Sequence, residues 1–226
     1  MGMSQRVWLL RAWVTCVVAL LAISAWGQGK PATLESVLNL LDERAASFKS
    51  VQTDFVWDQY QSVVNEHDKQ TGVMYFKRTG PGRVDVAADI KAPDQKKLLY
   101  TGGTVQIYSF RTHQVETYKA DQHRDEVESF LALGFGGRGH DLVKNFEVRY
   151  AGTETVNGHA TYKLELTPKA ERVRNMFREI TLWIDQQTGM SVQQKALEGQ
   201  SDYRLATYTN IRVNQPLPGG AFRLPK

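Results

Sequence analysis

Residues that commonly carry out chemistry occur in this chain of 226 residues, but their spacing does not form a known catalytic or metal-binding pattern. No two histidines stand at the i, i+4 spacing of a helical metal site. They are His67, His113, His123, His140 and His159. We interpret them as solvated loop residues. There is no Gly-x-Ser-x-Gly nucleophile elbow, and the single cysteine, Cys16, lies near the N-terminus. The chain is therefore not expected to be an enzyme, and no cofactor or metal is predicted.

Two further features could suggest chemistry. The glycine-rich segment 134–139 resembles a loop that cradles phosphate, but it lacks the Lys-Ser/Thr ending and follows no predicted strand. We interpret it as a flexible hinge between two helical pieces.

Asp185 and Glu198 could form an acid/base pair, but among 24 acidic residues such pairs arise by chance. A solvated sheet face is the simpler interpretation.

The N-terminus has the order typical of a secretory signal. Arg6 and Arg11 precede an apolar stretch, residues 12–25, which is followed by small residues. We expect export and cleavage after Gly27, leaving residues 28–226 as one domain. A retained membrane anchor is the alternative, but the apolar stretch is shorter than the roughly 20 residues that a spanning helix needs. Because Cys16 would be removed, the mature domain would have no disulfide.

The charge balance argues against nucleic acid as a partner. The precursor has 28 basic and 24 acidic residues, and two of the basic ones lie in the predicted signal peptide. The remainder is nearly neutral and shows no clustered basic face of the kind that phosphate neutralisation requires.

The order of predicted elements gives the fold class. Thr33 is a plausible N-cap for a helix whose apolar residues recur at helical spacing up to Phe48. From Val51 the period changes to two, and about eleven short strands follow, with a helical insert over residues 121–145. So many sequential strands favour a strongly curved antiparallel sheet. We predict an α+β fold, an incomplete β-barrel covered by a lid of helices.

The strands carry more large apolar and aromatic side chains than two modest helical layers need to cover. Ordinary core packing is one explanation. The other is that the concave face lines an apolar cavity, the usual ligand site of a barrel. We expect the cavity to be lined by Phe55, Trp57, Tyr75, Val84, Val86, Leu99, Ile107, Leu164, Leu182 and Ile184. The covering helices are expected to contribute Leu38, Leu41, Val127, Phe130, Leu131 and Leu142.

Several segments, each weak alone, together resemble the LolA-type periplasmic lipoprotein carriers. In the first half they are Phe48–Phe55, Gly72–Arg78 and Arg83–Val86, and in the second half Leu164–Lys169, Leu182–Gly189 and Phe222–Pro225. They follow the family's order and span essentially the whole mature chain. Thr79 departs from the family's preferred proline, and Val84 and Val86 stand where aromatic residues are common, which suggests a less aromatic cavity.

The resemblance implies a carrier that shields the acyl chains of lipoproteins. Its partners would be acylated lipoprotein cargo, an inner-membrane lipoprotein-releasing transporter and an outer-membrane acceptor lipoprotein, and the carrier would act as a monomer. The family's lid-latching arginine corresponds to Arg78, which would hold the lid helices around residues 124–144. An exposed strand-end arginine is the alternative for this residue. For the protein, the alternatives are a lipid- or lipoprotein-sensing regulatory protein on the same fold, or a secreted hydrolase.

Overall fold

The computed structural model describes residues 31–119, 131–199 and 201–225.

The first described element is a helix whose start is fixed by side-chain capping. Helix α2 (Leu34–Ser47) begins at Thr33, whose hydroxyl accepts a hydrogen bond from the Ser36 amide at 3.2 Å. The Ser36 hydroxyl accepts one in return from the Thr33 amide at 2.9 Å. The cap satisfies amides that have no partner within the helix. One face is buried, through Val37, Leu38, Leu41 and Ala45.

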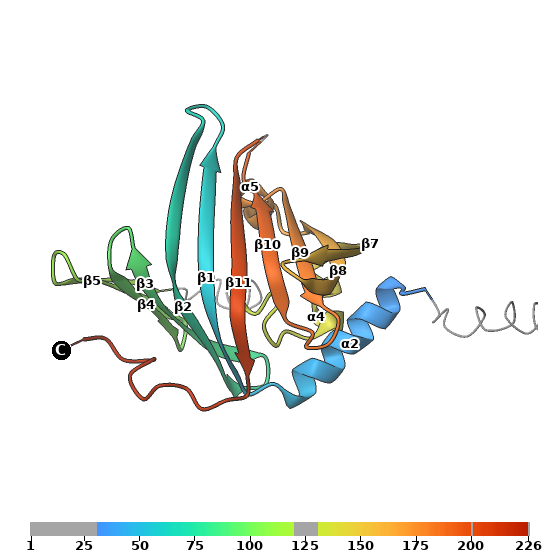
Figure 1. Ribbon diagram of the computed structural model, residues 1–226, viewed down its shortest axis with the longest axis horizontal. Helices are drawn as coiled ribbons and strands as arrows, with labels where there is room; N and C mark the ends of the chain where they lie inside the picture. Colours follow the sequence, from blue (N-terminus) through green and yellow to red (C-terminus); the bar gives the residue numbers. More distant parts are fainter. Residues whose placement is uncertain (1–30, 120–130, 200, 226) are drawn as a thin grey trace, which may run out of the picture. The chain divides into compact units, whose positions relative to one another are not determined.

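Eleven strands form one open antiparallel sheet (Figure 1). They are β1 (Ser50–Gln61), β2 (Glu66–Gly80), β3 (Arg83–Ala92), β4 (Lys96–Thr101), β5 (Thr104–Ser109), β6 (Gln114–Lys119), β7 (Phe146–Val156), β8 (His159–Pro168), β9 (Glu179–Asp185), β10 (Ser191–Leu197) and β11 (Tyr203–Val213). Their order is β6-β5-β4-β3-β2-β1-β11-β10-β9-β8-β7. Neighbouring strands are therefore consecutive in sequence, except where β1 pairs with β11 in the middle.

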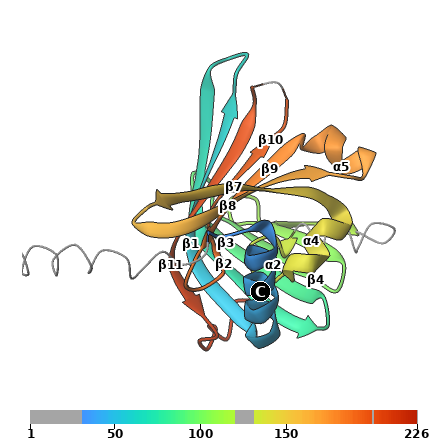
Figure 2. The ribbon, with the colours of Figure 1, turned by 90° about the vertical axis from the view of Figure 1, so that its right-hand side faces the viewer.

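The sheet curls so strongly that its last strands run across the direction of its central ones (Figure 2). A second helix, α4 (Gly139–Asn145), leads into β7. Together with α2 it packs on the inner face of the second half of the sheet, where Val37, Leu41 and Leu142 share a buried cluster with Leu164 and Leu182. The predicted incomplete barrel with helices over its concave face is confirmed.

The opposite, convex face of the first half is covered by the C-terminal segment, residues 214–225. Its Leu217, Ala221, Phe222 and Leu224 pack on the strand residues Val73, Tyr75, Ala87 and Leu99. This half of the sheet therefore has both faces partly covered, with alternate residues buried on the two sides.

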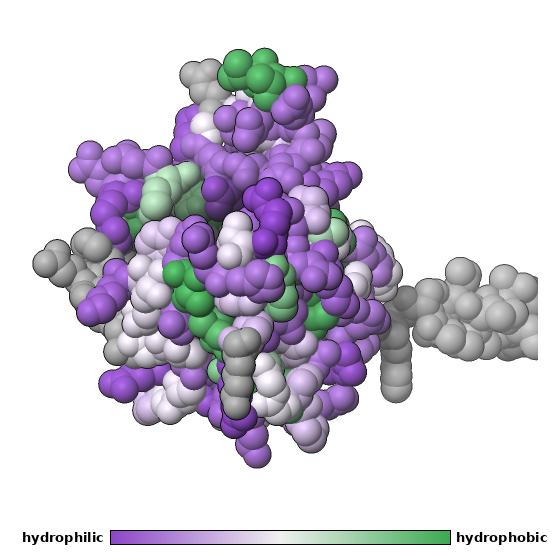
Figure 3. Space-filling view, turned by 90° about the vertical axis from the view of Figure 1, so that its left-hand side faces the viewer, coloured by the Kyte–Doolittle hydropathy of each residue, from purple (hydrophilic) through white to green (hydrophobic). Residues whose placement is uncertain are grey.

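The long β1–β2 hairpin extends beyond the rest of the sheet (Figures 1 and 3). Its turn exposes two hydrophobic residues, Val63 at 94% and Val64 at 54%. Figure 3 shows this hydrophobic tip above a mostly polar surface.

The described elements agree with the sequence prediction except in one respect. A short helix, α5 (Glu171–Met176), stands between β8 and β9 and was not expected, since none of its residues is buried and it leaves no apolar period. The structure describes part of the predicted helical insert, namely residues 131–138 and α4. The predicted signal peptide, residues 1–27, and the predicted lid residues Val127 and Phe130 lie outside the described residues. All elements above belong to one compact unit, Thr33–Lys226.

Candidate functional site

A cavity of about 280 Å³ lies on the concave face of the sheet, beneath the segment that precedes α4. Its apolar wall comes from strand residues and from that segment: Trp57, Met74, Phe76, Val86, Leu131, Leu133, Phe135, Phe177, Ile180, Ala196, Ala206 and Tyr208. Its polar residues are Asp58, Gln59, Asp68, Gln70, Gln194 and Arg204. A mainly apolar hollow with a few polar groups is the usual composition of a ligand site.

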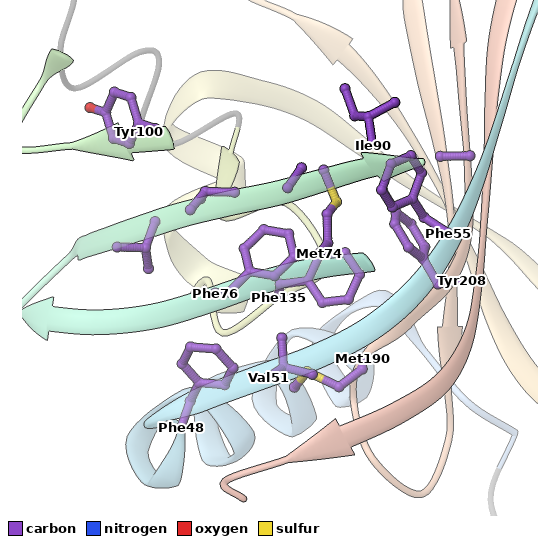
Figure 4. Close-up of a cluster of buried hydrophobic side chains, with 14 residues drawn as sticks. Phe48, Val51, Phe55, Met74, Phe76, Ile90, Tyr100, Phe135, Met190 and Tyr208 are labelled. Atoms are coloured by element: carbon purple, nitrogen blue, oxygen red, sulfur yellow. The ribbon is translucent and has the colours of Figure 1, made fainter. Parts of the chain in front are cut away.

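Phe135 lies beside Phe76 in the buried cluster of this concave face (Figure 4). Its side chain is 1% exposed and stacks on Phe76, with ring centroids 4.4 Å apart. The edge of Tyr208 meets the same ring at 4.7 Å. Burial raises the pKa of Tyr208, so its hydroxyl remains protonated. This hydroxyl donates a hydrogen bond to the side-chain oxygen of Gln194 at 3.3 Å. An aromatic side chain from outside the sheet therefore occupies space that an apolar ligand could take.

The segment that carries Phe135, which we call the lid segment (residues 131–138), is fixed by close packing. At Gly136, with φ +77°, an added Cβ would come within 2.3 Å of the Phe48 ring. At Gly134, with φ +74°, it would come within 2.4 Å of the Ser191 Cβ. Gln194 also donates to the Leu133 carbonyl at 2.7 Å. These glycines allow the lid segment to approach α2 and β10, and close approach rather than a hinge explains their presence.

Arg78, on the inner face of β2, joins the lid segment to the end of α2. Its Nη2 donates to the Gly136 carbonyl at 2.7 Å and to the Ala45 carbonyl at 3.2 Å, and its Nε donates to the Phe48 carbonyl at 3.1 Å. Carbonyls in the last turn of a helix have no partner within the helix, and a guanidinium can satisfy several at once. Its predicted role as a latch remains a prediction.

A second link joins α4 to α2 through His140. Its Nδ1 lies 2.6 Å from the Asp42 carboxylate, and its Nε2 lies 3.4 Å from Glu35. The hydrogen bond with Asp42 raises the pKa of His140. Burial alone would raise the pKa of Asp42, but its hydrogen bonds with His140 outweigh burial and lower it. Each partner therefore favours the charged form of the other.

The predicted cavity residues fall into separate places. Trp57 and Val86 line the cavity, and Phe55 and Val84 belong to the buried cluster around it. Ile107, on β5, pairs with Leu98 at the edge of that cluster. Leu164, Leu182 and Ile184 lie in the cluster beneath α2 instead, and do not line the cavity.

Tyr75 and Leu99 were expected in the cavity, and this prediction is wrong. Both belong to the cluster on the convex face, under the C-terminal segment. Their neighbours Met74, Phe76 and Tyr100 point inward in their place. The alternation of residues in a strand assigns them to two faces. When both faces are apolar, the alternation does not indicate which of the two points toward the inside of the barrel.

The predicted lid residues that are described cover the concave face. Leu131 lines the cavity, whereas Leu38, Leu41 and Leu142 are buried where the helices pack. Sequence reasoning missed Phe135 and Leu133, which lie in or beside the glycine run. A signal was available, because apolar residues between closely spaced glycines are typical of a tightly packed loop rather than a solvated one.

The residues considered for chemistry have structural roles. Asp185 accepts from the amides of Gln187 and Thr188 at 3.0 and 2.7 Å, so it shapes the turn between β9 and β10. Burial opposes ionisation of Asp185, but these hydrogen bonds and one from His159 outweigh it and lower its pKa. Glu198 pairs with Arg204.

Within the described ranges, no group of three or more histidine, cysteine or acidic side chains could hold a metal ion. No helix there is long and apolar enough to cross a membrane.

Comparisons with known proteins agree with this geometry. The family model described as outer membrane lipoprotein carrier protein LolA matches residues 46–225. The Pseudomonas aeruginosa MucA/MucB complex superposes with a TM-score of 0.53 at 16% identity and covers 86% of this chain. A crystal structure of MucB gives 0.55 at 16% identity and covers 85%. An uncharacterized conserved protein from Thermus thermophilus gives 0.54 at 10% identity, covering 85% of this chain and 94% of that one.

The matched region spans 62% of each MucB chain. Identities this low show a shared fold alone. No sequence among curated proteins matches the chain significantly.

Proposed function

Since the chain belongs to the LolA family of outer membrane lipoprotein carrier proteins, we propose that it carries lipoproteins from the inner to the outer membrane by enclosing their acyl chains in the cavity beneath Phe135. The family is a periplasmic, lipoprotein-binding one and not a family of enzymes. The observation that carries the proposal is the apolar cavity, whose wall is completed by side chains of a separate segment, among them Phe135.

The energetics require such a cover. Each methylene moved from water into an apolar site is worth about 0.8 kcal/mol, so a multiply acylated protein would not cross an aqueous space unaided. The cavity supplies apolar contacts, and its polar edge, with Gln59, Asp68 and Arg204, leaves room for the hydrophilic part of the cargo.

The cavity must enlarge to take a whole acyl chain. Its volume of about 280 Å³ falls just below the roughly 300–1,000 Å³ that is usual for ligand pockets. Withdrawal of Phe135 would join the space now filled by its ring to the cavity. We therefore propose that the structure is the cargo-free, closed form and that cargo shifts the protein toward an open form.

The remaining parts of the proposal follow from the carrier role. The protein is exported by the signal peptide, residues 1–27, and acts in the periplasm as a monomer. It receives cargo from an inner-membrane lipoprotein-releasing transporter and delivers it to an outer-membrane acceptor lipoprotein.

A binding experiment tests the cavity. The mature chain, residues 28–226, is titrated with a fluorescent acylated lipopeptide. Ala196→Phe places a ring in the cavity and should weaken binding by about tenfold, because about 1.4 kcal/mol of apolar contact is lost. The matched control is Val56→Phe, a position 42% exposed that does not line the cavity. Equal binding by the two variants would contradict this location for the acyl chains.

A transfer experiment tests the direction. Lipoprotein released from spheroplasts by the protein should pass to outer-membrane vesicles. Release without onward transfer would favour the second candidate function, a regulatory protein that senses lipid or lipoprotein. The fold shared with MucB, solved in complex with MucA, is the observation that favours this alternative.

A further inference from the structure

A second cavity, of about 520 Å³, opens beside Arg78 and shares no lining residue with the cavity proposed for acyl chains. It lies between the turn joining β2 to β3, the lid segment and α4. The lining residues are Arg78, Pro81, Gly82, Arg83, Val84, Ala132, Gly136, Gly137, Arg138, Asp141, Leu142, Lys144 and Asn145.

The charges in this second cavity are strongly unequal. Four cationic side chains line it, Arg78, Arg83, Arg138 and Lys144, against the single carboxylate of Asp141. Lys144 pairs with that carboxylate at 2.7 Å. The wall thus retains an excess of positive charge.

Two of the cations are not neutralised by any carboxylate in the described part of the chain. All three side-chain hydrogen bonds of Arg78 go to backbone carbonyls, which are neutral. Arg83 is exposed and, among the described residues, has neither an ion pair nor a side-chain hydrogen bond. Arg138 has only a 3.8 Å contact with Asp42 there. Their charge is therefore available to a ligand.

The same excess continues on the other side of Arg78. A cavity of about 500 Å³ there is lined by Lys49, Lys77, Arg78 and Arg223 and by no acidic residue of the described chain. Cationic side chains thus line cavities on both sides of Arg78, although the whole chain carries a net charge of only +4.

From these observations we propose that the second cavity binds an anionic group of the phosphate class, such as the phosphate of a phospholipid headgroup. Arginine forks match phosphate oxygens, and lysine adds a point charge. A concave wall of one sign of charge also raises the local concentration of anions. The cavity is large enough for a headgroup phosphate. This inference goes beyond the carrier function and does not depend on acyl-chain binding.

The test uses two probes and the mature protein. Inorganic phosphate is titrated by calorimetry at constant ionic strength, and flotation is measured with vesicles of equal parts phosphatidylcholine and phosphatidylglycerol, with phosphatidylcholine vesicles as the neutral reference. The variant is Arg83→Gln combined with Lys144→Gln. Both side chains are exposed, so folding should be retained. The control is Arg111→Gln with Lys119→Gln, which removes the same charge elsewhere.

We expect the cavity variant to lose affinity by about three- to tenfold relative to the control. Loss with both probes would indicate a site for free phosphate as well as lipid, and loss with vesicles alone would identify the headgroup as the source. If neither probe distinguishes the cavity variant from the control, the proposal is overturned. Acyl lipopeptide binding, measured in parallel, tests the carrier function separately.

Discussion

At the scale of single residues, Arg78 connects two parts of the cover through one side chain. Arg78→Leu removes three charge-assisted hydrogen bonds and should lower the free energy of unfolding by about 2–4 kcal/mol. The freed lid segment should take up acylated lipopeptide faster and release it less readily. Denaturant unfolding and stopped-flow fluorescence measure the two effects.

Arg111→Leu is the matched control, because Arg111 is an exposed arginine that lines neither cavity and has no side-chain partner in the described chain. Arg78→Lys keeps the charge without the fork and should be intermediate. An Arg78→Leu protein as stable as its control, with unchanged release, would remove the latch role.

His140 makes the contact between α4 and α2 depend on pH. The hydrogen bond with Asp42 raises the pKa of His140 above 6.5, so this stabilisation is complete below about pH 6.5 and is lost as pH rises through the folded pKa. The pKa of Asp42 is lowered below 3.8, so its contribution is present above about pH 4 and is lost on acidification. The contact should be strongest between these limits.

Hydrogen exchange checks this prediction. Amides of α4 should exchange faster, relative to those of the central strands, at about pH 8.5 than at about pH 6, after correction for intrinsic rates. Asp42→Asn should abolish the difference. His113→Gln should keep it, because His113 contacts Tyr108 rather than a carboxylate. An NMR titration of His140 at or below 6.5 would contradict the basis of the prediction.

Single residues were the hardest part to predict from sequence. Arg78 was found through a resemblance, because nothing in a strand-end arginine indicates that helix-end carbonyls lie nearby. Tyr75 and Leu99 were assigned to the wrong face, since the C-terminal segment that covers them is distant in sequence. Phe135 was missed because the glycines around it were interpreted as a flexible hinge.

At the scale of elements, the lid segment is anchored to the sheet by Phe135. Phe135→Ala should cost about 3–5 kcal/mol of stability, because a buried ring in contact with Phe76 and Tyr208 is lost. The vacated space enlarges the cavity, so acylated lipopeptide should bind more tightly and restore much of the lost thermal stability.

Phe110→Ala is the control for this change, since Phe110 is 40% exposed and does not line the cavity. Thermal unfolding with and without lipopeptide measures both effects. A Phe135→Ala protein that is destabilised but not rescued by the lipopeptide would show that the ring only fills a core.

Elements themselves were largely predictable. The change from helical to alternating spacing after Phe48 places the end of α2 and the start of β1 correctly, because each burial pattern follows from the geometry of its element. Helix α5 was missed because it packs no apolar face that would leave a period.

At the scale of the whole molecule, the C-terminal segment is a second cover, on the outside of the sheet. Truncation after Asn214 should expose Val73, Tyr75 and Leu99 together. We expect a lower melting temperature and increased binding of a hydrophobic dye, while lipopeptide binding on the concave face persists in the folded fraction. Loss of lipopeptide binding with unchanged stability would instead assign the segment to cargo handling.

The curved sheet with its cover could be predicted because many short sequential strands have few other solutions. The pairing of β1 with β11 could not, since no local pattern connects residues so far apart in sequence.

That pairing also governs the timing of folding. One edge of β1 has β2 as an immediate hairpin partner, but the other edge waits for residues 203–213. A chain synthesised from its N-terminus can form the β1–β6 meander early and the β7–β10 meander later, yet it cannot join them until residues 203–213 are available. Such long-range closure slows folding and leaves an unpaired edge in the meantime. The protein should therefore remain incompletely folded, and dependent on protection from aggregation, until its final strand arrives.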